Sequence, residues 1–314
     1  KTTQLADFYY ICHSRHTQWL KRQYGLCAHT AFSRDRSWQP KKIKIMQRIR
    51  NIGQGGLGIV DLYQAQNGGY FAVKQMIYAW DENHCERFKR EIKIMANLAH
   101  KNIVKCLNFD IHNDNPWYVM PYYKDGSLRD RLRDMKAQGK VYSPKAASGI
   151  IVYLADALNH AHQKGIIHRD LKPENILFNG REPLLADWGI GKFIHKESKV
   201  LTNGAIGTRA YCPPEQWNSG IADSRSDIFS LGLIYRELLT GELYGKVNDS
   251  RINQIINKMT AISPADRYQN ISEVIAAIKS LEIVSKKPLN DFWEGALIVA
   301  GVIGIVALLA AIFE

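Results

Sequence analysis

The sequence has few cysteines and no Cys-x-x-Cys pair. Its 314 residues include five cysteines, Cys12, Cys27, Cys85, Cys106 and Cys212, an odd number scattered along the chain. Small secreted domains held by disulfides, and the common zinc sites, use closely and regularly spaced cysteines. The cysteine pattern therefore suggests no disulfide framework and favours a reducing compartment for the main body of the protein.

Low-complexity tracts, internal repeats and an apolar N-terminal signal segment are also missing from the sequence. Because the chain begins with Lys1, we expect a processed or truncated product. Hydrophobic residues make up 46% of the sequence, which excludes disordered and fibrous classes. At about 100–200 residues per domain, the length allows one large or two modest domains.

Acidic residues are scarce near the N-terminus. The whole chain has 42 Lys and Arg against 30 Asp and Glu, a net charge of +12, but residues 1–50 alone hold 11 basic and two acidic residues. The first 50 residues thus carry +9 and the rest of the chain +3, so the sequence predicts no nucleic-acid partner for the main body. We expect residues 1–41 to form a basic extension that contacts anionic lipid headgroups or an acidic partner, or that serves only solubility.

The same extension contains a group of potential zinc ligands: Cys12, His13, His16, Cys27 and His29. Their spacing fits no common zinc finger, and packing or surface roles are more usual for such residues on an amphipathic helix. The sequence therefore predicts no metal site in this region.

One long apolar run lies at the other end of the chain. Residues 295–313 contain no charged residue, proline or polar side chain, and as a helix they would span about 28 Å, close to the hydrocarbon thickness of a bilayer. Phe292 and Trp293 precede the run as interfacial aromatic residues do. We expect a single-pass transmembrane helix, with a buried C-terminal core helix as the alternative.

Lysines upstream of this run place the preceding domain on the cytoplasmic side of the membrane; they are Lys279, Lys286 and Lys287. Within the run, Ala296, Ala300 and Gly304 recur at four-residue spacing, which allows two such helices to approach closely. The sequence therefore makes a homodimer a candidate assembly.

Between the two ends, the patterns predict strands first and helices afterwards. Alternating residues predict strands from Lys42 to the glycines and over 59–63, 70–76, 104–110 and 117–120, with a turn at 67–69. Helical periodicity predicts helices over 86–98, 128–138, 143–165, 227–239, 249–259 and 271–281. A strand-rich part followed by a helix-rich part is typical of the α+β class.

A glycine motif ends the first expected strand. Gly53, Gly55 and Gly58 stand at Gly-x-Gly-x-x-Gly spacing, and the absence of side chains lets a backbone approach a phosphate. A dinucleotide fingerprint needs a helix to begin inside this motif, whereas residues 59–63 continue as a strand. The pattern therefore favours a hairpin that covers phosphates. Lys74, on the third strand, is costly to bury alone, and Glu91 is its candidate partner.

The most specific segment runs from His168 to Asn175 (HRDLKPEN) and is followed after 11 residues by Asp187-Trp188-Gly189. With the glycine motif and Lys74, it makes residues 42–283 resemble a eukaryotic-type Ser/Thr protein kinase. The Pro-Pro-Glu-Gln-Trp sequence at 213–217 gives the resemblance a bacterial character.

This resemblance implies a two-lobed protein-kinase fold, with a strand-rich N-lobe over 42–122 and a helical C-lobe over 123–283. A juxtamembrane linker over 284–294 and the transmembrane helix over 295–313 would follow.

The resemblance also implies the site residues. Four residues would be catalytic. Asp170 would accept the hydroxyl proton, and Lys172 would neutralise charge on the transferred phosphate. Asn175 and Asp187 would bind Mg²⁺, or Mn²⁺ in its place, through their oxygens. ATP would be bound by Gly53, Gly55, Gly58, Val60, Ala72, Lys74, Glu91, Met120 and Tyr122. In this set Val60 and Ala72 sandwich the adenine, Met120 is the gatekeeper and Tyr122 belongs to the hinge. Lys172 together with Thr208 points to Ser/Thr acceptors in protein substrates.

Regulatory roles are implied for the segment between Asp187 and Glu215, which resembles an activation segment. Arg169 needs an anionic partner, which a phosphorylated loop residue would supply. The first candidate is Thr202 and the second is Ser198, and we expect autophosphorylation to raise activity. By the same resemblance, Asp227 would hold the catalytic loop, the segment from His168 to Asn175.

The resemblance further implies an ion pair between Arg267 and Glu215. The sequence departs from the family pattern at Trp188, Leu57, Pro121 and Pro213, but none of these changes removes a catalytic group. Three functions remain open: an active membrane-anchored Ser/Thr kinase, a nucleotide-binding pseudokinase, and a small-molecule phosphotransferase.

Overall fold

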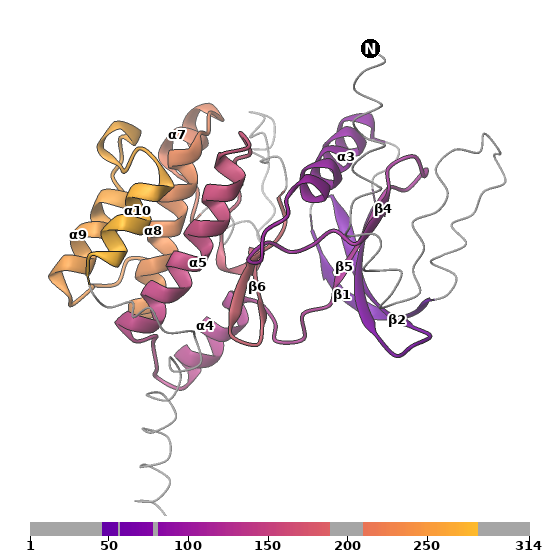
Figure 1. The fold of residues 1–314 in the computed structure, drawn as a ribbon, viewed down its shortest axis with the longest axis horizontal. Helices are drawn as coiled ribbons and strands as arrows, with labels where there is room; N and C mark the ends of the chain where they lie inside the picture. Colours follow the sequence, from indigo (N-terminus) through magenta and orange to yellow (C-terminus); the bar gives the residue numbers. More distant parts are fainter. Residues whose placement is uncertain (1–45, 56, 78–80, 189–209, 282–314) are drawn as a thin grey trace, which may run out of the picture. The chain divides into compact units, whose positions relative to one another are not determined.

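The computed structural model describes residues 46–55, 57–77, 81–188 and 210–281 (Figure 1). The chain divides into two compact units, residues 1–124 with 185–192 and residues 125–184 with 193–314. The basic extension, its potential zinc ligands, the linker and the apolar run at 295–313 lie outside the described residues. Within the described part of the chain, none of the helices combines the length and the apolar character that crossing a bilayer needs.

The first unit is built on a five-stranded sheet in the order β1-β2-β3-β5-β4, with every neighbouring pair antiparallel. The strands are β1 (Met46–Gln54), β2 (Gly58–Ala65), β3 (Tyr70–Met76), β4 (Asn108–Asp110) and β5 (Trp117–Pro121). The expected strands at 59–63, 70–76 and 117–120 are confirmed. The strand expected over 104–110 is wrong at its start, because the Val104 amide donates to the carbonyl of Leu185 instead of extending β4.

Both faces of this sheet are covered by apolar side chains. On one face Phe71, Val73, Trp117 and Val119 form a buried cluster. Because side chains alternate along a strand, Ala72, Lys74 and Met76 of β3 point to the other face.

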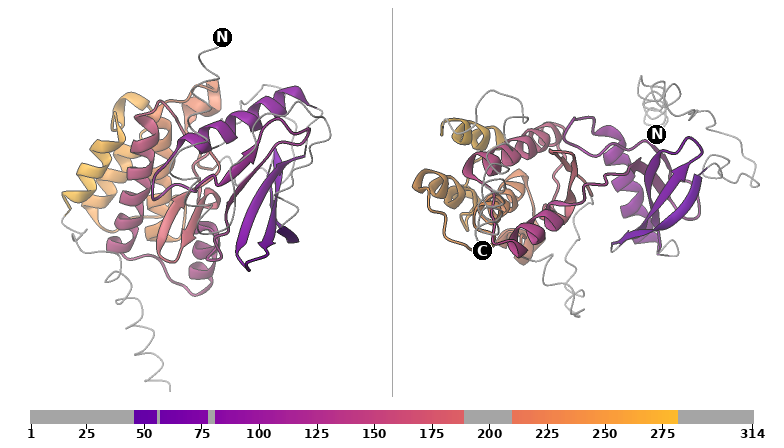
Figure 2. Two further views of the ribbon diagram at one scale, coloured as in Figure 1. Left: turned by 45° about the vertical axis from the view of Figure 1, so that its right-hand side comes forward. Right: turned by 90° about the horizontal axis from the view of Figure 1, so that it is seen from below.

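Helix α3 (Glu82–Asn97) covers this second face with buried Phe88, Ile92 and Met95 (Figure 2). The helix begins four residues before the expected start. The reason is an N-cap: the Asp81 side chain accepts a hydrogen bond from the amide of His84.

The second unit is mainly helical. Its helices are α4 (Leu128–Ala137), α5 (Pro144–His162), α7 (Pro214–Ser219), α8 (Ser224–Thr240), α9 (Ser250–Met259) and α10 (Ile271–Lys279). The five longer helices were predicted; α7 and the short hairpin of β6 (Ile176–Asn179) and β7 (Glu182–Leu185) were not. Runs of four to six residues are too short for periodicity to reveal.

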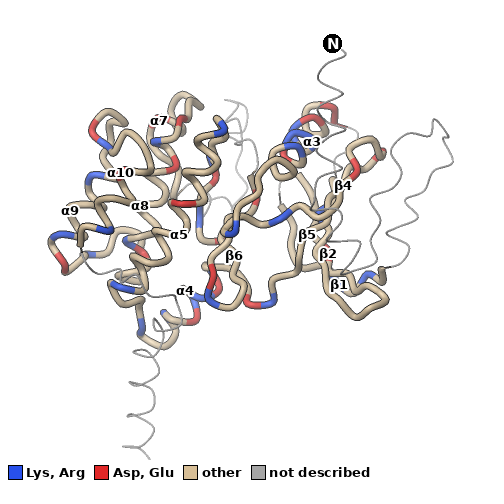
Figure 3. The backbone as a smooth tube through the Cα atoms, in the orientation of Figure 1, with Lys and Arg blue, Asp and Glu red and all other residues tan. Residues whose placement is uncertain are grey.

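Helix ends in this unit follow the usual capping rules. Ser127 with Asp130 forms a capping box at the start of α4, and Asp223 with Ser226 forms another at the start of α8. Gly241 ends α8 in the left-handed conformation, with φ of 71°. Figure 3 shows basic and acidic residues interspersed along the backbone of each unit, in keeping with the near balance of charge outside the N-terminus.

Candidate active site

The three predicted glycines differ in what the surrounding structure requires of them. A Cβ on Gly58 would lie 2.5 Å from the carbonyl oxygen of Gln75 and 3.3 Å from the Phe88 ring. A Cβ on Gly53 or Gly55 would meet nothing closer than 3.9 Å. Packing of β2 against β3 and α3 therefore requires glycine at 58. At Gly53 and Gly55 the protein leaves room for a Cβ, so packing within the described residues does not require glycine at these two positions.

Lys74 of β3 forms the predicted ion pair with Glu91 of α3. Its Nζ lies 2.7 Å from Oε1 of Glu91, and the two residues are 7% and 1% exposed. The same Nζ lies 2.6 Å from Oδ1 of Asp187. Burial alone would lower the pKa of Lys74, but the Asp187 and Glu91 carboxylates outweigh it and raise this pKa well above the ordinary value. Lys74 is therefore a buried, permanently charged ammonium beside two carboxyl groups.

Tyr118 of β5 is a fourth member of this group, beside Lys74, Glu91 and Asp187, and was not predicted from the sequence. Its hydroxyl donates to Oε1 of Glu91 at 2.8 Å, and it stands directly opposite Lys74 in the β3–β5 register. Burial, followed by the charge of Glu91, raises the pKa of Tyr118 well above its ordinary value, so the phenol remains a donor. The signal was present in the sequence: strand alternation places Tyr118 on the same face as Met120.

The residues predicted to surround an adenine all lie in the first unit. Val60 is in β2, while Ala72 in β3 is the direct cross-strand partner of Met120 in β5. Ala72 and Met120 are both buried. Tyr122 follows the last residue of β5, and its ring centroid lies 6.4 Å from that of Tyr70. The sheet thus brings Ala72 and Met120 side by side.

Asp187 and Arg169 have unusual backbones. Among the described residues, they are the non-glycine positions with positive φ, 58° for Asp187 and 66° for Arg169. Each such conformation costs on the order of 1–3 kcal/mol and is kept only where the surroundings fix it, which is common at functional sites. Asp187 keeps its side chain 41% exposed while contacting Lys74, so its carboxylate is accessible to a metal ion. The next residue, Trp188, is buried.

Three of the predicted catalytic residues meet in the second unit. Lys172 Nζ lies 2.7 Å from Oδ2 of Asp170. Nδ2 of Asn175 donates to the backbone carbonyl of Asp170 at 2.8 Å and to its Oδ2 at 3.2 Å. These bonds orient the Asp170 carboxylate. They also leave Oδ1 of Asn175 as the oxygen that could bind a metal ion.

Asp227 of α8 holds the backbone of the catalytic loop, as predicted. It is fully buried, and it accepts hydrogen bonds from the amides of His168 and Arg169, each at 2.9 Å. His162 of α5, which the sequence analysis missed, lies 2.8 Å from the same carboxylate. Burial alone would raise the pKa of Asp227, but the His162 and backbone hydrogen bonds hold this pKa below its ordinary value. Helix α8, through Asp227, therefore fixes the positive φ of Arg169.

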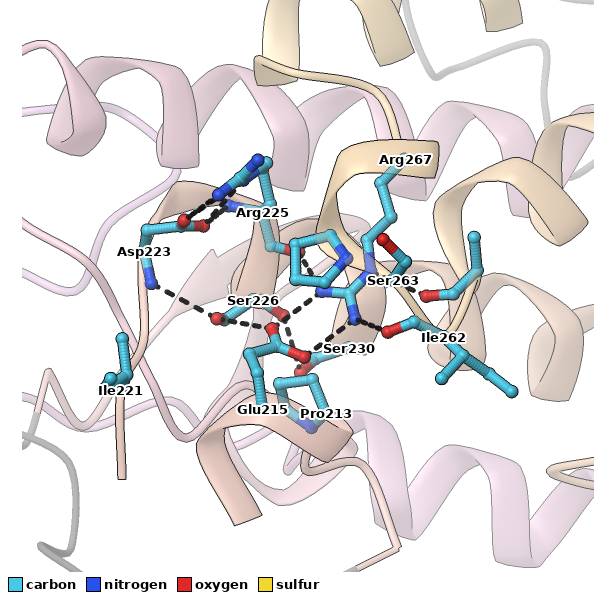
Figure 4. Close-up of polar contacts among 12 residues, drawn as sticks. Pro213, Glu215, Ile221, Asp223, Arg225, Ser226, Ser230, Ile262, Ser263 and Arg267 are labelled. Atoms are coloured by element: carbon cyan, nitrogen blue, oxygen red, sulfur yellow. Dashed lines mark hydrogen bonds and ion pairs between the residues drawn. The ribbon is translucent and has the colours of Figure 1, made fainter. Parts of the chain in front are cut away.

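Arg267 and Glu215 form the predicted ion pair, with both guanidinium nitrogens bound to the carboxylate at 2.8 Å (Figure 4). Arg267 also donates to the backbone carbonyls of Ala261, Arg225 and Ile262. Its side chain is fully buried. The residue after Glu215, Gln216, donates to the Arg169 carbonyl at 2.7 Å. The start of α7 is thus bonded both to the loop before α10 and to the catalytic loop.

A second network, partly exposed and not predicted, centres on Arg129 of α4. Its guanidinium lies 2.8 Å from Glu174 and 2.7 Å from Glu237 and donates to the Tyr211 hydroxyl at 2.7 Å. The Tyr211 hydroxyl in turn donates to Glu237. Because Glu174 stands between Lys172 and Asn175, this network connects α4 and α8 to the catalytic loop.

The predicted regulatory residues Thr202, Ser198 and Thr208 lie outside the described residues. Arg169 is described, but the segment expected to supply its anionic partner is not.

Comparisons with known proteins agree on one family. Residues 46–297 match the family described as protein kinase domain. The chain is 30% identical over 264 residues to the serine/threonine-protein kinase PrkC of Bacillus subtilis, an alignment that covers 74% of this chain and 40% of the relative. It is also 30% identical over 235 residues to the serine/threonine-protein kinase PknL of Mycobacterium tuberculosis, covering 67% of this chain and 57% of the relative.

Among solved structures, the kinase domain of Mycobacterium tuberculosis PknI has the same fold. It matches 76% of this chain and 96% of its own with a TM-score of 0.60 and 24% identity. The chain spans about two fifths of the length of PrkC and of the other first relatives it matches.

Proposed function

The chain belongs to the protein kinase domain family and has its two-lobed fold, and from this premise we propose that it is an ATP-dependent protein-serine/threonine kinase. The likeness to bacterial Ser/Thr kinases and the identity of Lys172 support Ser and Thr hydroxyls of proteins as the acceptors.

The observation that carries the proposal is the charge cluster formed by buried Lys74 and Glu91 with the partly exposed Asp187. Taking charged groups out of water costs several kcal/mol per ion, and an apolar set of similar volume is often as stable. Stability alone therefore gives no reason to keep Lys74 in the core. Binding of a phosphate group gives such a reason, because the ammonium has three N–H donors to share between carboxylates and phosphate oxygens.

On the nucleotide side, Lys74 would hold the α- and β-phosphates while Glu91 fixes its position. The backbone at Gly53 and Gly55 would cover the phosphates, at positions where protein packing does not itself require glycine. Val60, Ala72, Met120 and Tyr122 would line the adenine.

Asp187 and Asn175 fit a hard divalent cation, because each can offer an oxygen ligand. Mg²⁺, or Mn²⁺ in its place, would neutralise negative charge on the phosphates when bound.

On the acceptor side, Asp170 would take the proton of the attacking hydroxyl. The hydroxyl oxygen forms a bond to the γ-phosphorus, the bond from that phosphorus to the β–γ bridging oxygen breaks, and ADP leaves. Lys172 and Asn175 keep the Asp170 carboxylate oriented for this transfer. Lys172 would also balance charge on the transferred phosphoryl group, since phosphoryl transfer depends mainly on positioning and electrostatics.

The test is transfer of label from γ-labelled ATP with Mg²⁺ to a generic basic protein, followed by phosphoamino-acid analysis. We expect phosphoserine and phosphothreonine with the wild type, and loss of transfer in Asp170→Asn and Lys74→Met. Asp134→Asn is the matched control, because that carboxylate is 69% exposed and its ion-pair partner is its neighbour Arg133. Nucleotide binding without transfer would refute the proposal and indicate a pseudokinase.

We further propose autophosphorylation at Thr202, or secondarily at Ser198, in the segment that includes Thr208. Arg169 supports this proposal, because it stands beside Asp170 and offers a cation that a phosphate could pair with. Mass spectrometry of the active protein should find phosphate at Thr202. Full activity with both Thr202 and Ser198 bare would contradict it.

Membrane anchoring by residues 295–313, with the kinase domain of 42–283 on the cytoplasmic side, is also a proposal, and the apolar run supports it. The full chain should resist carbonate extraction from membranes, whereas a chain ending at residue 283 should not.

Pairing through Ala296, Ala300 and Gly304 would make autophosphorylation faster at low concentration only in the anchored form. Residues 1–41 are proposed to bind anionic lipid headgroups. A chain that lacks the anchor should bind anionic vesicles, and this binding should be lost when residues 1–41 are also removed.

A further inference from the structure

Two hydrogen-bond donors converge on one carboxylate oxygen in the first unit. Oε1 of Glu91 lies 2.7 Å from Nζ of Lys74 and accepts from the hydroxyl of Tyr118 at 2.8 Å. We infer that Tyr118 is a positioning residue for nucleotide binding: its hydroxyl holds Glu91, and through Glu91 it keeps Lys74 in place for the ATP phosphates. This inference rests on the proposed kinase function.

The geometry ties α3 to two adjacent strands through one side chain. Glu91 comes from α3, while Lys74 and Tyr118 are direct cross-strand partners in β3 and β5. Glu91 is 1% exposed, so its charge has to be satisfied by protein donors. The ring of Tyr118 is itself packed against Phe88 of α3, with centroids 6.0 Å apart. Packing of the ring on Phe88 therefore helps to aim the hydroxyl at Glu91.

The bond from Tyr118 differs in kind from the one made by Lys74. Lys74 divides its donors between Glu91 and Asp187, and a bound phosphate would compete for the same ammonium. Among the described contacts, the Tyr118 hydroxyl donates only to Glu91. It can hold the Glu91 carboxylate unchanged while the contacts of Lys74 are redistributed. Without it, Glu91 would depend on the one group that the nucleotide also uses.

The substitution Tyr118→Phe isolates the hydroxyl, because it keeps the ring that packs on Phe88. We expect the KM for ATP to rise roughly tenfold, equivalent to about 1.4 kcal/mol. The KM for the protein substrate should stay unchanged and kcat should stay within about twofold. The dissociation constant for Mg-ADP, measured by calorimetry, should weaken by a similar factor. Tyr63→Phe is the control, since Tyr63 lies on β2 and packs against the apolar cluster on the other face of the sheet.

A merely structural role would give a different result. Loss of folded protein lowers kcat through the active fraction and leaves the KM for ATP unchanged, so that pattern would overturn the inference. Unchanged KM and unchanged Mg-ADP affinity in Tyr118→Phe would overturn it as well. In a Glu91→Gln background, Tyr118→Phe should add less than threefold to the KM for ATP, because its effect acts through Glu91; an undiminished tenfold effect there would also count against it.

Failure of the proposed function is distinguishable from failure of this inference. If the wild type binds Mg-ADP but transfers no phosphate, the kinase proposal fails, and the affinity of Tyr118→Phe for Mg-ADP still decides the role of Tyr118. If the wild type binds no nucleotide, both are refuted.

Discussion

Removal of the Arg267 side chain is expected to destabilise the second unit strongly. Arg267→Met keeps much of the apolar stem but deletes a guanidinium that is fully buried. The change leaves Glu215 without its bidentate partner and three backbone carbonyls without their donors. Breaking a buried ion pair by removing one partner costs about 3–5 kcal/mol. Because the Glu215 side chain keeps 19% exposure and can be partly hydrated, we expect the lower part of this range, about 3 kcal/mol.

The assay is thermal unfolding of the full chain followed by circular dichroism. For a unit of this size, about 1 kcal/mol corresponds to roughly 2–4 °C, so Arg267→Met should lower Tm by about 6–12 °C. Arg251→Met is the matched control, since Arg251 is 63% exposed and pairs with its near neighbour Asp249. It should change Tm by less than about 2 °C.

Two outcomes would refute this reasoning. One is a Tm for Arg267→Met within about 2 °C of the wild type. The other is strict additivity with Glu215→Gln, because two residues that form one bidentate pair should be coupled in a double-mutant cycle.

Three further predictions follow from other parts of the structure. Gly58→Ala should lower the free energy of unfolding, measured in urea, by about 1–3 kcal/mol, because its Cβ would be forced against the carbonyl of Gln75. Gly53→Ala should change the free energy of unfolding by less than about 0.5 kcal/mol and should raise the KM for ATP in kinase assays. The pKa of Asp227 is held below 3.8, so its stabilising effect is complete above that pH and is lost as pH falls through the lower folded value. Between pH 6 and pH 3 the wild type should therefore lose more unfolding free energy than Asp227→Asn, and equal losses would contradict this. Chelation of divalent metal with EDTA should abolish phosphoryl transfer, and either Mg²⁺ or Mn²⁺ should restore it, measured with labelled ATP.

The sequence predicted most of the long elements, because their hydrophobic periodicity extends over enough residues to be recognised. It failed where tertiary contacts decide the structure. Residues 104–107 look like a strand, yet the Val104 amide pairs with Leu185, a contact between segments 81 residues apart. The start of α3 depends on the cap made by Asp81, which periodicity does not contain.

The candidate site divides in a similar way. Lys74, Glu91, Asp170 and Asp187 were found because their chemistry comes with recognisable spacing. Tyr118 was not, although it contacts Glu91 directly.

The contacts of His162 and of Arg129 were not predicted either. His162 and Arg129 carry no motif, and only the fold places them against Asp227 and Glu237. For His162 and Arg129, unlike Tyr118 with its strand alternation, no pattern in the single sequence indicates the role.

The unequal packing of Gly53 in β1 and Gly58 in β2 bears on how variants of this protein are interpreted. A screen that scores only phosphoryl transfer would report Gly58 and Gly53 substitutions as the same loss. By the packing described above, we expect Gly58 substitutions to lower the amount of folded protein, and Gly53 substitutions to leave that amount unchanged while weakening nucleotide binding. Abundance measured beside activity would separate the two, and a dominant-negative variant should be sought at Gly53 and not at Gly58.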